Sequence, residues 1–225
     1  MASALLGFLE TKYIRTTTAL ARYHMPGLAD CDGLALACSM AYLLTRYTSQ
    51  DIQSLFAQAQ DPRVMEFFPG LGTYEWASTF VERQQKQFAQ HKTCYWAVRK
   101  NGSNNDNLVT LNTSLHAAKS LPYLGFVGVI HNTVAGVKEN YWDIGWRLAP
   151  ALWGKGITVP AAQAAMQHIQ DMHPDARFHA VITDTNQPSI QVATRLGMKR
   201  SQSFQHPMLL KHPELVNCGM WSTNT

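Results

Sequence analysis

Charged side chains are scarce in this chain. Only 15% of its 225 residues are Asp, Glu, Lys or Arg, and the net charge of +4 is spread without a run of basic residues. Proteins that bind nucleic acid usually concentrate Lys and Arg on one face. The sequence therefore predicts no nucleic-acid partner, although a weakly basic surface could still favour acidic substrates.

Cysteine patterns and long apolar runs are also missing. The cysteines Cys31, Cys38, Cys94 and Cys218 lack metal-ligand spacing, and no processed secretory signal is evident. We therefore expect no metal, free thiols in a reducing compartment and a cytoplasmic location. The apolar run from Leu34 to Leu44 is about half the roughly 20 residues that a membrane helix needs, so no membrane role is expected.

The length suits one main domain, which we place over residues 41–225 after an N-terminal extension, 1–40, that contains a possible hairpin. Ser49 and Thr73 are expected to cap the first two helices. Residues 100–121 are predicted to form a polar loop, and residues 132–140 to connect two antiparallel strands. Strands are predicted at Leu43–Tyr47, Cys94–Val98, Leu124–His131, Tyr141–Leu148, Phe178–Thr183 and Leu215–Trp221, and helices over Ile52–Ala59, Trp76–Phe88, Ala162–Met172 and Pro188–Leu196.

The most informative stretch runs from Asp143 to Met172. Its first part alternates between two faces, which predicts a half-buried strand, and Pro150 stops that strand. An Ala-rich run at helical spacing follows, with Pro160 in the first turn, where a missing N–H is tolerated. One face of the strand holds Trp142, Ile144, Trp146 and Leu148, and the other holds Tyr141, Asp143, Gly145 and Arg147.

The loop from Trp153 to Gly156 therefore joins a strand to a helix. Two glycines one residue apart let the backbone approach a ligand, and the free amides of the helix favour an anion such as phosphate. Two nucleotide motifs fail, because Val159 replaces the third glycine of a dinucleotide fingerprint and Ala149 replaces the first glycine of a Walker A loop. An ordinary tight turn is the alternative.

The whole string from Asp143, Asp-Ile-Gly-Trp-x-Leu-Ala-Pro-x-x-Trp-Gly-Lys-Gly, resembles the acyl-CoA pyrophosphate loop of the GNAT superfamily of N-acyltransferases. The resemblance is to the branch that includes ribosomal-protein N-terminal acetyltransferases (RimJ/RimL-like). It implies an α+β fold whose central mixed, mostly antiparallel twisted sheet is flanked by helices, with acetyl-CoA as cosubstrate and no metal. The expected cofactor-binding residues are Gly145, Trp146, Leu148, Trp153, Gly154, Lys155, Gly156, Ile157, Asn186 and Ser189.

A second stretch, Thr185–Met198, predicts a short helix with Pro188 near its start and Gly197 at its end. It resembles the second superfamily signature, Asn-x-x-Ser followed by Leu-Gly. In relatives the Asn contacts the pantetheine arm and the Ser lies near the thiol, which assigns these roles to Asn186 and Ser189. The similarity covers roughly Leu43 to Trp221.

The implied reaction is direct transfer of an acetyl group to an amine, which needs a base for the amine and a proton donor for the thiolate. Asp143 is the candidate base, at a position where relatives often have Glu, and an ion pair with Arg147 is its structural alternative. Ser189 is the candidate acid, because Ala193 stands where many relatives have Tyr; its alternative role is structural, within the first helical turn. His131 and His179 are substitute bases.

The class of acceptor amine can be weighed by the free-energy cost of removing its proton at pH 7. Uncharging an α-amine of pKa about 8 at pH 7 costs roughly 1.4 kcal/mol, whereas a lysine amine of pKa about 10.4 costs roughly 4.6 kcal/mol. Together with the branch resemblance, this favours a protein or peptide N-terminus. A small-molecule amine and a catalytically weak acyl-CoA-binding module are the alternatives. Phe67 and Phe68 are expected either to wall the acceptor site or to plug the core, and the chain to act as a monomer or homodimer.

Overall fold

The computed structural model describes residues 36–39, 42–100, 121–134 and 138–223. One eight-stranded sheet runs through them in the order β1-β2-β3-β4-β5-β6-β8-β7. Every neighbouring pair is antiparallel except β5 and β6, which are parallel. The strands are β1 (Leu36–Ser39), β2 (Tyr42–Thr45), β3 (Tyr95–Lys100), β4 (Tyr123–Val134), β5 (Lys138–Leu148), β6 (Phe178–Thr183), β7 (Lys199–Gln205) and β8 (Asn217–Ser222).

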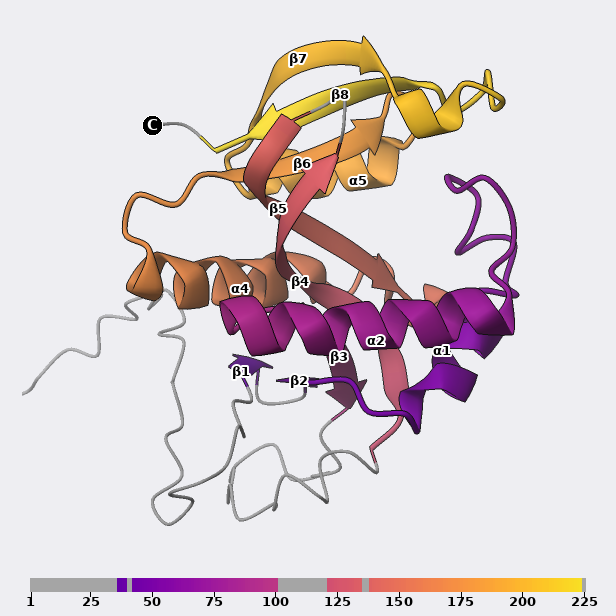
Figure 1. Cartoon of the computed structure of the whole chain (residues 1–225), viewed down its shortest axis with the longest axis vertical. Coiled ribbons are helices and arrows are strands. Elements are labelled where there is room, and N and C mark those ends of the chain that lie inside the picture. Colours follow the sequence, from indigo (N-terminus) through magenta and orange to yellow (C-terminus); the bar gives the residue numbers. More distant parts are fainter. Residues whose placement is uncertain (1–35, 40–41, 101–120, 135–137, 224–225) are drawn as a thin grey trace, which may run out of the picture.

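Helices cover both faces of this sheet (Figure 1), and the predicted mixed, mostly antiparallel α+β class is confirmed. Two short 3-10 turns, η1 (Pro150–Leu152) and η2 (Pro207–Leu209), follow β5 and β7. The α-helices are α1 (Asp51–Gln58), α2 (Tyr74–His91), α4 (Thr158–Met172) and α5 (Gln187–Arg195).

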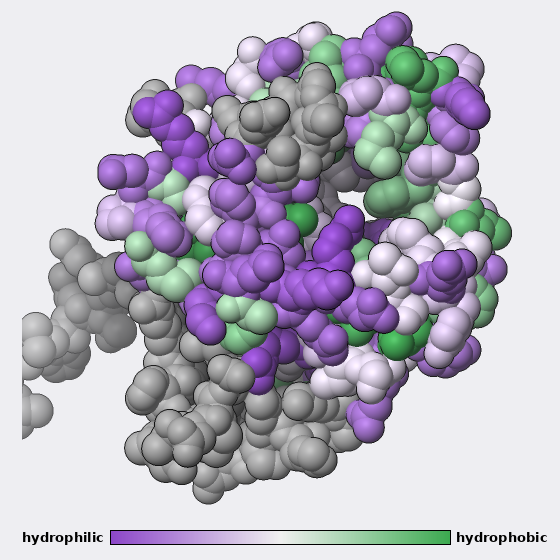
Figure 2. Space-filling view, viewed as in Figure 1, coloured by the Kyte–Doolittle hydropathy of each residue, from purple (hydrophilic) through white to green (hydrophobic). Residues whose placement is uncertain are grey.

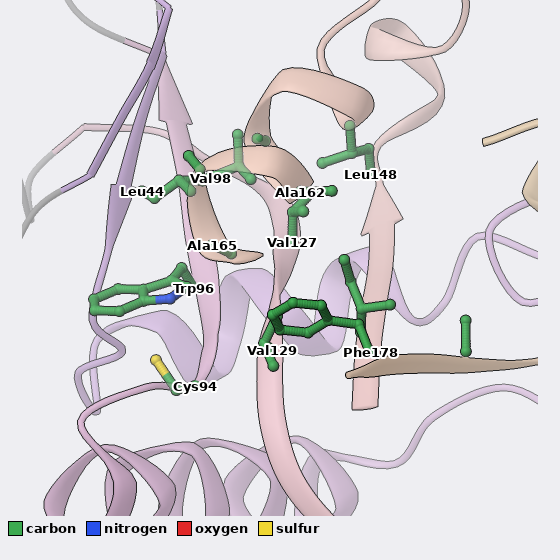
Figure 3. Close-up of a cluster of buried hydrophobic side chains, with 14 of the residues drawn as sticks. Leu44, Cys94, Trp96, Val98, Val127, Val129, Leu148, Ala162, Ala165 and Phe178 are labelled. Carbon is green, nitrogen blue, oxygen red and sulfur yellow. The ribbon is translucent and has the colours of Figure 1, made fainter. Parts of the chain in front are cut away.

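Side-chain alternation along the strands divides the core into two layers. On one face, Phe126 and Ile130 of β4 pack with Phe80 of α2. On the other face, Val127 packs with Ala165 of α4 (Figure 3). The small, buried alanines of α4 let the helix pack closely against the sheet.

Strand β5 lies inside the sheet, and this corrects one expectation. The alternation predicts a half-buried strand, but Tyr141 and Arg147 on one face are as buried as Ile144 and Leu148 on the other. A charged side chain at position 147 would suit a solvent-facing side of the strand. The structure instead covers that face with α1, α2 and the loop between them.

A buried ion pair ties α1 to the sheet. Arg99 of β3 contacts Asp51 at 2.6 Å, and Asp51 also accepts the backbone N–H of Thr48 at 2.8 Å. Ser49 is not the helix cap that we expected; the cap position is Gln50, which makes no side-chain capping bond. Asp51, the first residue of the helix, instead accepts the backbone N–H of Thr48, which fixes the chain just before the helix.

Two strand boundaries also differ from expectation. The predicted connection over 132–140 is mostly strand, since β4 runs to Val134 and β5 starts at Lys138. Strand β7 is absent from the sequence prediction. It lies at the edge of the sheet and six of its seven residues are exposed, so its sequence carries no apolar alternation.

Other expectations from the sequence can be compared with the described residues. The Thr73 cap is confirmed, because its Oγ1 accepts the N–H of Trp76 at 3.0 Å. Strand β1 pairs antiparallel with β2, whereas a hairpin within residues 1–35 and the loop over 101–120 lie outside the described residues.

Cys94 and Cys218 are buried free thiols. Within the described segments, no helix is long and apolar enough to cross a membrane.

Candidate active site

The two parallel strands separate immediately after one point of the sheet. β5 and β6 are in register only at Trp142 with Phe178 and at Asp143 with His179. From Gly145 to Leu148, β5 keeps its β4 partner but has no strand partner on its β6 side in the part of the chain that the structure describes. Strand backbone groups on an unpaired side can bind an extended ligand. Figure 2 shows the surface hollowed between the part that holds β6 to β8 and the part that holds α1 and α2.

The loop that follows β5 has the geometry of an anion site. Gly154 and Gly156 have φ of +71° and +69°, and a Cβ added at either would meet nothing within 4 Å. These left-handed conformations explain why both positions are glycine. Helix α4 starts at Thr158, and no side chain of the described residues caps its N-terminus. Its first amides are therefore free to bind an anion that approaches over the open glycines.

The other loop residues frame this helix end. Ile157 is buried beneath it, whereas Lys155 and Trp153 are exposed. The indole N–H of Trp153 donates to the carbonyl of Leu148 at 2.9 Å, which fixes the loop against the end of β5. Leu148 is one of the expected cofactor-binding residues, but its carbonyl already accepts this hydrogen bond within the protein.

Asp143 lies at the point where β5 and β6 separate. Its carboxylate accepts a hydrogen bond from the Tyr95 hydroxyl and a longer one, 3.4 Å, from Asn132 Nδ2. Burial raises the pKa of Asp143 to about 6, against the lowering effect of these two hydrogen bonds. The described residues give it no ion pair with Arg147. A half-buried carboxylate with a pKa near neutrality can take a proton from an amine.

Tyr95 is a site residue that the sequence reasoning missed. A Cβ at Gly145 would lie 2.9–3.0 Å from the Tyr95 ring and hydroxyl, so Gly145 is needed to make room for this side chain. Tyr95 also stacks on Phe126, with ring centroids 5.1 Å apart. The sequence gives little signal for this contact, because Tyr95 reads as an ordinary strand aromatic and stands 48 positions from Asp143.

Helix α5 brings the second motif against β5. The Trp146 indole N–H donates to Ser189 Oγ at 3.3 Å, and the Ser189 backbone N–H donates to Asn186 Oδ1 at 3.1 Å. Asn186 is thus the N-cap of α5, which satisfies one of its free amides. Both residues are half-buried. The structural alternative for Ser189 is therefore partly realised, while its hydroxyl still contacts the strand that carries Asp143.

The two histidines proposed as substitute bases lie on opposite faces of the sheet. His179 is the register partner of Asp143, so it shares that residue's face, and its Nδ1 lies 2.7 Å from Ser222 Oγ. His131 pairs with Trp142 and therefore points away from Asp143. Of the two, His179 is placed to influence the carboxylate.

Arg147 lies four residues beyond Asp143 on the same face. Its guanidinium carbon is 4.8 to 5.2 Å from the ring centroids of Trp76, Phe126 and Phe68. Phe68 belongs to the loop between α1 and α2 and is 40% exposed, whereas Phe67 is half-buried. Of the two phenylalanines, Phe68 is the one whose ring lies against Arg147.

Comparisons with known proteins agree with this geometry. The family model described as an acetyltransferase (GNAT) domain matches residues 42–199, which is more than half of the chain. The chain therefore belongs to the GNAT family. Among the described residues no cluster of three or more metal-ligating side chains occurs.

Solved structures share the fold. A GNAT-family acetyltransferase of Bordetella pertussis is 17% identical, with a TM-score of 0.64 over 84% of this chain and 99% of its own. RimL, a ribosomal L7/L12 alpha-N-protein acetyltransferase, is 14% identical, with a TM-score of 0.61 over 92% and 100%. The microcin C7 self-immunity acetyltransferase MccE, solved with acetyl-CoA and AMP, is 15% identical, with a TM-score of 0.61 over 84% and 96%. The resemblance to the RimL branch is therefore confirmed at the level of fold.

Proposed function

We propose that this protein is an N-acetyltransferase that moves an acetyl group from acetyl-CoA directly to a primary amine. The observation that carries the proposal is the separation of β5 from β6 after Asp143. It leaves an unpaired strand side that starts at a carboxylate with a raised pKa and ends beside an uncapped helix N-terminus. An extended thioester and its phosphates fit along this line.

The residues present fit coenzyme A. The free amides at the start of α4 are proposed to bind the pyrophosphate, where the glycine at position 156 leaves space for close approach. Lys155 is exposed, so it adds less than the amides do. The pantetheine arm is proposed to lie between β5 and α5, with Asn186 and Ser189 beside it. MccE, which shares the fold, was solved with acetyl-CoA, and this supports acetyl-CoA as the cosubstrate.

The proton transfers are assigned to residues around Gly145. The acceptor amine forms the new C–N bond while the C–S bond breaks, so one proton must leave the nitrogen and one must reach the thiolate. Asp143 is proposed to take the first proton, held in position by the Tyr95 hydroxyl. Ser189 is proposed to supply the second from the α5 side of the strand.

The acceptor is proposed to be a protein or peptide α-amine. A base of pKa about 6 suits an amine that is partly uncharged near pH 7, and lysine is a harder target by roughly 3 kcal/mol. RimL, which is a ribosomal-protein alpha-N-acetyltransferase, supports this class. MccE, a microcin C7 self-immunity acetyltransferase solved with AMP, is the observation behind the second candidate, a small-molecule amine.

The test is acetyl-CoA turnover by the purified full-length chain against panels of N-terminal peptides, polyamines, amino acids and aminoglycosides. We expect CoA release that depends on peptides with a free α-amine. Preference for a small amine would replace the proposed acceptor class. Tight CoA binding without turnover of any amine would instead identify an acyl-CoA-binding module.

A further inference from the structure

Arg147 is a buried cation without a counter-charge among the described residues. Arg147 is only 6% exposed to solvent. Nη1 contacts Met65 Sδ at 3.2 Å, while Nε and Nη2 are buried and have no hydrogen-bond partner among the residues that the structure describes. Burial lowers the pKa of Arg147. An unpaired buried charge is costly, and aromatic rings replace only part of its lost hydration.

The two unpartnered nitrogens suggest what the site accepts. Nε and Nη2 lie on one edge of the planar guanidinium, and that edge can bind a carboxylate through two parallel hydrogen bonds. Of the three rings around Arg147, the Phe68 ring is the one carried by a loop, and it is the most exposed. Phe68 is therefore the one of these three contacts that can be displaced without moving a helix or a strand.

The spacing along β5 relates this edge to the reaction centre. Asp143 and Arg147 share a face and are four residues apart, which is about 13 Å along a strand. An extended peptide spans that distance in about four residues. The amine and carboxylate of a free α-amino acid are only two bonds apart, so one amino acid cannot reach both groups.

We propose that Arg147 binds a carboxylate of the acceptor, and that the acceptor is a peptide with an acidic side chain within about its first four residues. The inference rests on the proposed function, because it places the α-amine at Asp143. Arg147 acts as a specificity residue, and the net charge of +4 would assist an acidic partner. The C-terminal carboxylate of a short peptide offers the same chemistry from a second source.

Peptide affinity for the CoA-saturated full-length protein tests this proposal without requiring turnover. Calorimetric titrations would compare pentapeptide amides that carry Glu at position 2, 3 or 4 with the matched Gln peptides. We expect the best Glu peptide to bind about 10-fold to 100-fold more tightly than its Gln partner. A tripeptide with a free C-terminus, compared with its amide, distinguishes the second source of the carboxylate.

Arg147→Met should abolish this difference between Glu and Gln peptides. Lys86→Met removes the same charge from the exposed face of α2 and should preserve the difference. The wild-type comparison stands even if Arg147→Met does not fold. Equal affinities for charged and neutral peptides, a preference retained in Arg147→Met, or no binding of any peptide would overturn the proposal.

Acetylation of the same peptides tests the proposed function separately. If Glu and Gln peptides are acetylated with equal efficiency and bound with equal affinity, the carboxylate site is refuted and the proposed N-acetyltransferase function is supported. If Glu peptides bind more tightly but no peptide is acetylated, the carboxylate site is supported and the proposed N-acetyltransferase function is refuted.

Discussion

Asp143→Asn should make the protein more stable at neutral pH while it lowers activity. The ordinary aspartate pKa of 3.8 is raised to about 6 by burial. Between these values the folded chain holds a proton that the unfolded chain releases, so the free energy of unfolding falls as pH rises. The loss is complete above pH 6 and amounts to roughly 3 kcal/mol. An asparagine avoids it, because its Oδ1 can still accept the Tyr95 hydroxyl.

The measurement is urea unfolding followed by tryptophan fluorescence at pH 4.5 and pH 7.5. We expect the gain of Asp143→Asn over wild type to grow by about 2 kcal/mol between these pH values. Asp175→Asn changes an exposed aspartate between α4 and β6 and is the control, expected to show no such growth. A stability difference that is the same at both pH values would refute the raised pKa.

The kinetic half of the prediction uses the same variant. Loss of a general base should lower the rate of the chemical step by about 10² or more, with CoA affinity near normal. Activity should partly recover at high pH, because the acceptor amine then loses its proton to solvent. A pH-independent loss would mean that Asp143 holds structure, and His179 would become the candidate base.

Three further substitutions test the rest of the site. Gly156→Val should weaken CoA binding far more than Gly197→Val, although both positions have positive φ and open space around them, because only the first faces the phosphates; calorimetry with CoA measures the difference, and equal losses would contradict the site. Tyr95→Phe removes a hydrogen bond that stabilises the carboxylate, so the acid limb of the pH–rate profile should move to higher pH; an unmoved limb would separate the tyrosine from the base. Ser189→Ala should lower the chemical step less than loss of the base, without rescue at high pH; such a rescue would argue against an acid role.

Local patterns predict the elements that carry their own periodicity. β6 matches its predicted bounds, α5 lies within one residue of its prediction at both ends, and α4 ends at the predicted residue but starts at Thr158. Apolar spacing and helix-stop residues depend only on nearby positions, so the sequence shows them directly. The loop glycines at 154 and 156 are also predictable, because two glycines one residue apart before a helix favour left-handed backbone without any distant contact. The edge strand β7 could not be predicted, because a strand exposed on almost all its length needs no apolar pattern.

Contacts between distant segments were beyond such patterns. The Tyr95 ring over Gly145 joins β3 to β5. The three rings around Arg147 come from α2, β4 and the loop between α1 and α2, and each of these residues alone looks ordinary. The spacing of Asp143 and Arg147 on one strand face allows an ion pair between them, which was the structural alternative for Asp143. In the structure Asp143 accepts the Tyr95 hydroxyl, whose ring lies over Gly145 between the two positions, and Arg147 packs against aromatic rings.

The most direct test of the central claim is a single-turnover experiment with a peptide that carries both a free α-amine and a lysine. The full-length protein, in excess over acetyl-CoA, is mixed with the peptide, and fragmentation mass spectrometry locates the acetyl group. Transfer to the α-amine in wild type, with transfer slowed by about 10² in Asp143→Asn, is the predicted result. Transfer to the lysine, or no transfer of any acetyl group while CoA binds normally, would contradict the account.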